Sequence, residues 1–200
     1  MSEPTTNPWI EPDEERAPVR RGRARSHWQR EPEREGEEPQ PVSDEQAEQI
    51  ARTIILNRLD RSSASRSQLA ELCAKKLVPD HIADRVLDRF EEVGLIDDAA
   101  YAAMLVRTRH AERQLAGKAL RAELVKKGIT GAAAMQALEQ VDEDDELQAA
   151  REIVAKRMRQ SSMQSAPRDV QKRRLLGALG RKGHSSSVAY RVIDEALGRD

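Results

Sequence analysis

Two stretches of this 200-residue chain concentrate positive charge, and their residues are the best candidates for binding another molecule. Residues 104–130 contain seven lysines and arginines against two glutamates. Residues 161–190 contain six against one aspartate, although the net charge of the whole chain is −1. Clustered cations attract polyanions and acidic protein surfaces, and the alternative for either stretch is the solvated face of a helix. The candidate partner-binding residues are Arg107, Arg109, Arg113, Lys118, Arg121, Lys126, Lys127, Lys172, Arg173, Arg174, Arg181 and Lys182.

Catalytic and metal-binding chemistry has no comparable set of residues in the sequence. The histidines are scattered and lack a Cys or His neighbour at metal-ligand spacing, so we expect each at the surface or at the boundary of the core. No arrangement pairs a nucleophile with a base. The sequence therefore predicts a protein that is not an enzyme and has no catalytic residue, metal site or cofactor. The histidines are His27, His81, His110 and His184.

Three further features have a structural interpretation that we prefer. Residues 177–183 contain glycines and a lysine, as a phosphate-binding loop does, but they lie inside a helical pattern with no preceding strand. The acidic residues 142–146 could hold a divalent cation, but their position favours a joint that stabilises the N-terminus of the next helix. Cys73 falls on an apolar helical face, where we expect a buried and unreactive thiol.

The overall composition indicates helices. One Phe, two Tyr and two Trp exclude a large aromatic core, and the apolar residues are Ala, Leu, Val and Ile interleaved with Arg, Lys and Glu. No apolar run approaches the ~20 residues that span a bilayer, and the N-terminus has no apolar segment typical of a secretory signal. These features predict a cytoplasmic protein without membrane contact.

The first 42 residues differ in composition from the rest of the chain. They hold seven of the nine prolines, mixed charges and few aliphatic side chains, so they cannot bury enough surface to offset the entropy of ordering. We expect a disordered tail. Five arginines between Arg16 and Arg25 could contact nucleic acid or simply keep the tail soluble.

Helix signals begin directly after this tail. Ser43 with Gln46 forms the pattern of a capping box, Ser65 with Gln68 repeats it, and apolar residues then recur at helical spacing. Since no convincing alternation of apolar and polar residues indicates a strand, we expect eight or nine short helices.

An internal repeat organises these helices. Leu77, Gly128 and Gly183 occupy equivalent positions 51 and 55 residues apart, and each follows a lysine. Apolar residues recur around them at six fixed offsets. These are Leu69, Leu120 and Leu175 (eight before), Cys73, Leu124 and Leu179 (four before), Ile82, Ala133 and Val188 (five after), Val86, Ala137 and Val192 (nine after), Leu87, Leu138 and Ile193 (ten after), and Phe90, Val141 and Ala196 (thirteen after).

The offsets place apolar groups on one face of each of two consecutive helices, which must therefore fold back on each other. A preceding helix, at residues 44–60, 98–112 and 144–160, supplies the third wall of each unit. The predicted fold is all-α, with three tandem three-helix repeats that form an elongated, curved rod. The repeats comprise residues 43–96, 97–141 and 142–200, after the disordered tail of residues 1–42.

Segments of these repeats resemble the RecX family. Residues 94–98 read GLIDD and are followed by Tyr101-Ala102 and Val106-Arg107, while residues 117–129 read GKALRAELVKKGI. Residues 65–69, which read SRSQL, are similar to the opening of the family's first repeat. The ordered set covers about residues 44–198. The chain departs from the family where Tyr101 replaces the more usual Phe, and its third unit keeps only the general pattern.

The same motif residues have a plain structural explanation. Gly94 and Gly128 stand where the end of a helix requires a left-handed residue, and Asp97 or Asp98 would cap the next helix. We expect Leu95 and Ile96 to be buried between repeats. The GLIDD segment is therefore interpreted as a structural elbow and not as a binding site.

The resemblance implies a function. RecX proteins bind the filament that the RecA recombinase forms on single-stranded DNA, lie in its helical groove, and restrain ATP hydrolysis, strand exchange and coprotease activity. We accordingly expect a monomeric regulator whose partner is the RecA filament, with single-stranded DNA as a further partner left open. Two alternatives remain: a direct DNA-binding helical protein, and a helical-repeat adaptor for another protein.

Overall fold

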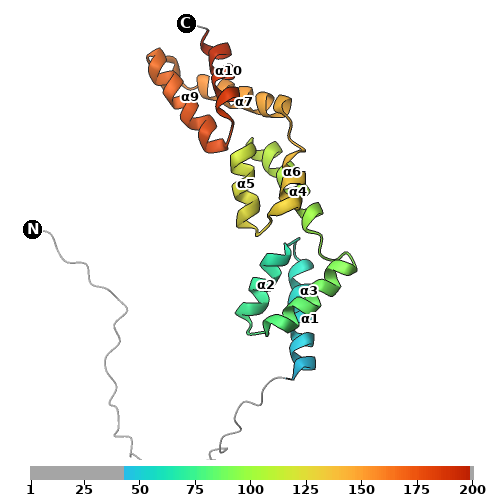
Figure 1. Ribbon diagram of the computed structural model, residues 1–200. Helices are drawn as coiled ribbons and strands as arrows, with labels where there is room; N and C mark the ends of the chain where they lie inside the picture. The colour runs from blue at the N-terminus through green and yellow to red at the C-terminus, as the bar shows by residue number, and fades with distance from the viewer. Residues whose placement is uncertain (1–42, 199–200) are drawn as a thin grey trace, which may run out of the picture. The chain divides into compact units, whose positions relative to one another are not determined.

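The computed structural model describes residues 43–198, and this part of the chain is entirely helical (Figure 1). The predicted all-α class is therefore confirmed. The predicted disordered tail, with the Arg16–Arg25 patch and His27, lies outside the described residues. The helices are α1 (Asp44–Leu59), α2 (Arg66–Lys75), α3 (Asp80–Glu92), α4 (Asp98–Arg113), α5 (Gly117–Lys126), α6 (Gly131–Leu138), α7 (Glu143–Met158), α8 (Ser161–Gln164), α9 (Arg168–Lys182) and α10 (Ser186–Leu197).

The predicted capping signals set the helix ends. Ser43 and Ser65 each accept a hydrogen bond from a backbone N–H three residues later and form complete capping boxes. Asp142 does the same at the start of α7, so the acidic segment acts as a helix cap. The described residues contain ten helices, where the sequence predicted eight or nine, because the short α8 precedes α9.

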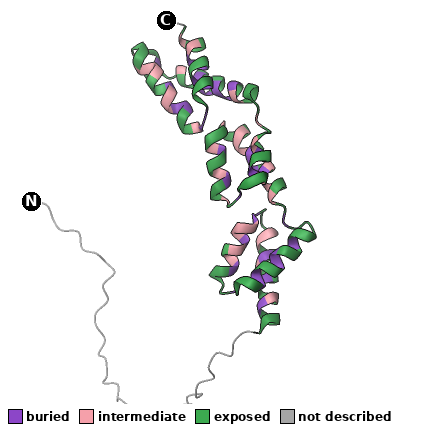
Figure 2. Ribbon diagram, in the orientation of Figure 1, coloured by how far each residue is buried: buried purple, intermediate pink, exposed green. Residues whose placement is uncertain are grey.

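Three separate apolar cores divide the described helices into three modules. Module 1 comprises α1–α3, module 2 comprises α4–α6, and module 3 comprises α7–α10 (Figure 2). The repeat positions supply six of the thirteen buried core residues of module 1, three of the eight of module 2 and five of the twelve of module 3, and Cys73 is fully buried as expected. One repeat position is wrong in the third module, because Ala196 is exposed near the end of α10. The predicted module boundaries and the curved-rod shape remain predictions.

The turn after α3 departs from the sequence analysis. Gly94 has a φ of 72° and follows the end of α3, as predicted, and Asp97 caps α4. Ile96 is buried, but Leu95 is 51% exposed, so the expectation that both residues are buried is wrong. Both backbone N–H groups donate to the carbonyl of Phe90, and only the second of the two side chains faces the core.

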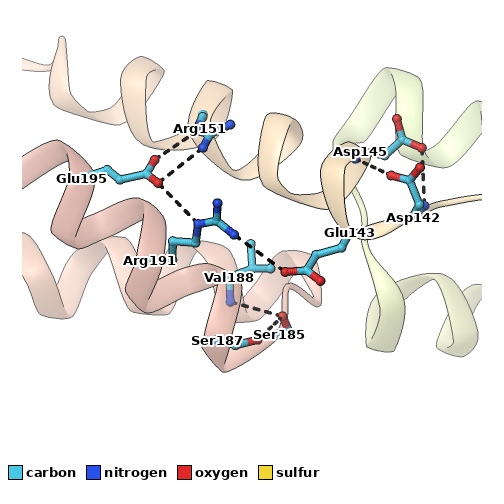
Figure 3. Close-up of polar contacts among 9 residues, drawn as sticks. All are labelled: Asp142, Glu143, Asp145, Arg151, Ser185, Ser187, Val188, Arg191 and Glu195. Atoms are coloured by element: carbon cyan, nitrogen blue, oxygen red, sulfur yellow. Dashed lines mark hydrogen bonds and ion pairs between the residues drawn. The ribbon is translucent and has the colours of Figure 1, made fainter.

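An ionic network joins α7 to α10 on the surface of module 3 (Figure 3). Arg151 donates to Glu195 at 3.0 and 3.3 Å, and Arg191 lies 3.5 Å from Glu195 and 3.8 Å from Glu143. The Arg151 guanidinium holds the pKa of the Glu195 carboxyl below its ordinary value. Three of these side chains are about half exposed and Glu143 is 75% exposed, so the network contributes little to stability, but it keeps their charges engaged with one another.

Candidate partner-binding surface

The junction of modules 2 and 3 brings the two basic stretches together. The last turn of α9 lies against the first turn of α5, where the Ala116 N–H donates to the Lys182 carbonyl at 2.9 Å. The Lys118 N–H donates to the Gly183 carbonyl at 3.3 Å. Ala116 has no side chain that could cap α5, so the carbonyls of α9 satisfy N–H groups that would otherwise lack partners. The negative end of one helix thus meets the positive end of the other.

Glycine is required at the centre of this contact. Gly183 ends α9 in the left-handed region with a φ of 85°. A Cβ atom built on it would lie 2.3 Å from the Ala119 nitrogen and 2.6 Å from the Ala116 oxygen, both of which are backbone atoms. The Lys182 ammonium also donates to the Arg113 carbonyl across the same junction. We call this contact of the α9 turn with the start of α5, which joins modules 2 and 3, the second joint. The first is the contact that joins modules 1 and 2, where the Ser65 hydroxyl donates to the Lys127 carbonyl.

A groove of about 990 Å³ lies beside the second joint and is lined by residues of α4, α5, α7 and α9. Four predicted residues line it, two from each basic stretch, and the C-terminal half of α7 adds two cations that the prediction lacked. We call it the basic groove. Its cations are Arg113, Lys118, Lys156, Arg157, Arg181 and Lys182.

Most of these cations lack an anionic partner within the described residues. Among the groove's cations, as far as residues 43–198 show, only the Lys182 ammonium has a hydrogen bond, to a backbone carbonyl. Two carboxylates line the groove, but Glu123 is 3.6 Å from Arg109 and Glu152 accepts a hydrogen bond from Gln148. Unpaired charges of one sign in a concave surface repel one another and attract an anionic ligand. The arrangement therefore favours binding of phosphates or of clustered carboxylates.

A second cavity of about 380 Å³ shares residues with the basic groove. Arg157 and Arg181 line both, and Arg173 and Arg174 belong to the second cavity alone. Gly177 lies inside α9, as expected, and a Cβ there would come within 3.3 Å of the Arg181 guanidinium. Six of the twelve predicted residues thus line these two neighbouring cavities.

The remaining six predicted residues are placed differently. Arg109 is paired with Glu123, and Lys172 lies 3.7 Å from Asp194 and 5.9 Å from the centroid of the Tyr190 ring. Four others line neither cavity, and among them only Lys127 is partly buried. They are Arg107, Arg121, Lys126 and Lys127.

The sequence analysis missed Lys156 and Arg157 because they end a helix that begins with four acidic residues, so the local net charge is small. The three cations at positions 156, 157 and 159 were the sequence signal from which these two groove residues could have been predicted.

His184 contradicts the expected surface position. It follows the second joint directly, its side chain is fully buried, and its Nε2 donates to the Gln114 carbonyl at 3.2 Å. Its Nδ1 has no hydrogen-bond partner in the described structure and lies 3.6 Å from Glu146 Oε1. Burial lowers the pKa of His184, although Glu146 opposes this shift, and His110 and Lys182 add to it.

This environment predicts a loss of stability in acid. A folded-state pKa below the unfolded value means that stability is complete above the unfolded pKa of about 6.5 and declines as pH falls below it. One proton sets a ceiling of about 1.4 kcal/mol per pH unit. The urea midpoint, followed by circular dichroism, should fall between pH 7.5 and pH 5.5, and His184→Gln should reduce that fall. An equal fall in both proteins would contradict the prediction.

Residues 43–198 contain neither a helix suited to cross a membrane nor a cluster of metal-binding side chains. No helix there combines the length and apolar character needed to cross a lipid bilayer. In the same range, no three His, Cys, Asp or Glu side chains gather where they could hold a metal ion.

Comparison with known proteins gives consistent matches. The family model for the second three-helix domain of RecX matches residues 97–138, and that for the third matches residues 143–193. Regulatory protein RecX of Streptomyces coelicolor is 44% identical over 147 residues, covering 74% of this chain and 77% of that protein. The protein of the same name from Mycolicibacterium smegmatis is 36% identical over 172 residues, covering 82% and 92%. A crystal structure of regulatory protein RecX superposes with a TM-score of 0.69 at 25% identity, covering 75% of this chain and 74% of that one.

Proposed function

Because this chain belongs to the RecX family of regulatory proteins, we propose that it binds the RecA filament on single-stranded DNA and restrains RecA activity. The affected activities are ATP hydrolysis, strand exchange and coprotease function. The role is not enzymatic, since the chain acts by occupying the filament. The observation that carries the proposal is the basic groove, whose unpaired cations suit an acidic protein surface or DNA phosphates.

The modular architecture supports this role. Each module has its own core, and successive modules can contact successive parts of a repeating partner. Linked contacts of modest strength then act together, because the first contact raises the effective concentration of the next. We propose that the twelve predicted cations form the docking surface, and that the basic groove is its centre.

The direct test is ATP hydrolysis by purified RecA on single-stranded DNA, with this protein added in increasing amounts. We expect the hydrolysis rate to fall as the protein saturates the filament. An unchanged rate at a several-fold molar excess over RecA would refute the proposal.

A second experiment distinguishes binding to the RecA filament from direct binding to DNA. The same cations could bind free DNA, in which case the affinity would fall steeply with salt and would not require RecA. Fluorescence anisotropy of labelled single-stranded DNA without RecA, at 50 and 200 mM salt, measures this. If the affinity for bare DNA accounts for all of the inhibition, the DNA-binding alternative replaces the filament-binding proposal.

A further inference from the structure

Residues 43–198 contain three copies of one backbone turn. In each module the second long helix, which is α2, α5 or α9, is followed within two residues by a residue of positive φ: 60° at Leu77, 72° at Gly128 and 85° at Gly183. The residue that follows is buried in all three modules, as Val78, Ile129 and His184.

The hydrogen bonds of the first two turns match as well. The N–H groups of Leu77 and Gly128 donate to carbonyls three residues earlier at 2.9 Å, and those of Val78 and Ile129 donate five residues back at 3.1 and 3.0 Å. The N–H of His184 also donates five residues back, to the Leu179 carbonyl at 3.2 Å. The three turns are therefore structurally equivalent.

Two of the three turns are docking elements within the molecule. The turn at Gly183 forms the second joint, against the start of α5. The turn at Gly128 lies against the start of α2, where the Ser65 hydroxyl donates to the Lys127 carbonyl. A Cβ built on Gly128 would lie 2.2 Å from the Ser67 Oγ. Each of these turns thus contacts the preceding module, and each requires glycine.

The third turn has no preceding module among the described residues, and it carries leucine in place of glycine. Leu77 is 91% exposed, the largest exposure among the large apolar residues of the described structure. It combines two unfavourable features, since a branched L-residue is strained at this φ and an aliphatic side chain is left in water. Such strain is retained where a functional contact requires it. Lys75 and Lys76, both exposed, precede it directly, and Lys75 lies 3.8 Å from Glu71 on its own helix.

We propose that the Lys76–Leu77 turn is the chain's docking element for its protein partner, with Leu77 inserted in an apolar pocket that has an acidic rim. The inference rests on the proposed function, in which that partner is the recombinase filament. A leucine cannot form a joint of the internal kind, because its Cβ would collide as it would at positions 128 and 183. A pocket accommodates the side chain, and the lysines match the acidic rim.

Leu77→Gly tests this proposal without damaging the fold. The substitution removes the side chain and gives the turn the residue found at its two counterparts, so the midpoint of thermal unfolding should equal or exceed that of the unchanged protein. The concentration that half-inhibits RecA ATPase should rise about tenfold or more, as expected for loss of a central apolar contact. Met135→Ala is the matched control, since Met135 on α6 is also exposed, at 56%, and its truncation should leave inhibition unchanged.

Three outcomes would overturn the proposal. If Leu77→Gly inhibits as well as the unchanged protein, Leu77 makes no contact with the filament. If that variant inhibits normally but self-associates in analytical ultracentrifugation, Leu77 only blocks end-to-end stacking of copies. If the unchanged protein itself has no effect on RecA, the proposed function fails and this inference fails with it.

Discussion

Gly183→Ala is expected to open the second joint while leaving the three apolar cores intact. Alanine at a φ of 85° costs about 1–2 kcal/mol, and its Cβ would collide with backbone atoms of α5 that cannot rotate away. Overpacking of this kind adds roughly 1–3 kcal/mol. The free energy that protects the joint should therefore fall by about 2–5 kcal/mol, and the basic groove, which the joint holds together, should lose its inhibitory activity.

Hydrogen exchange measures this effect directly, because the Ala116 and Lys118 amides donate across the joint. Both amides should exchange much faster in Gly183→Ala, while amides in the middle of α3 keep their protection. Gly94→Ala is the matched control, since Gly94 has a φ of 72° but no atom within 4 Å of the added Cβ. Gly94→Ala should therefore lower stability through backbone strain alone, without a steric collision. Equal effects of the two substitutions would mean that the close approach at Gly183 does not hold the joint.

Charge reversal in the basic groove is expected to produce the largest change in partner binding. Arg113→Glu with Arg181→Glu alters one cation from each basic stretch, and neither side chain has an ionic partner within residues 43–198. A hydrogen bond to a charged group contributes about 1.5–3 kcal/mol, so losing two should weaken filament binding on the order of 100-fold to 10,000-fold. Inhibition of RecA ATPase should fall accordingly, and the circular dichroism spectrum should not change.

Two other double variants locate the surface. Arg61→Glu with Arg85→Glu makes the same change of charge in module 1, at exposed side chains away from the basic groove, and should have little effect. Arg121→Glu with Lys126→Glu tests the exposed cations of α5 that line neither cavity. We expect an intermediate loss, since these two cations belong to the proposed docking surface but lie outside its centre, the basic groove. If all three double variants lose the same affinity, binding depends on net charge and the groove has no special role.

The sequence predicted the elements of this fold well because its signals are local. The serines at 43 and 65 satisfy helix N-termini three residues away, and repeated apolar offsets define each core from within one module. The burial of His184 could also have been found, because the repeat places it where Val78 and Ile129 stand in the other modules. Treating it as one scattered histidine among others ignored that equivalence.

The groove could not be predicted in the same way. The contact that unites the two basic stretches is made by backbone atoms, and it is possible because Gly183 has no side chain. No residue pattern in the sequence therefore predicts which helices contact each other. The interval of 55 residues between the last two repeat positions, against 51 between the first two, combines a longer α9 and the added α8 with a shorter α6, since α9 has 15 residues where α5 has 10 and α6 has 8 where α3 has 13. Charge counts along the chain identified the cations but could not show which of them share a surface.

The division of the interior into three cores affects how this chain loses its structure. Each module buries its own aliphatic side chains, and only a few polar contacts and close glycine approaches couple it to the next. We therefore expect melting to be a set of local equilibria and not a single all-or-none event, as in repeat proteins. A single midpoint of thermal unfolding therefore averages over modules that differ in stability. A heated sample would hold chains in which one module has denatured while its neighbours still occupy their part of a partner.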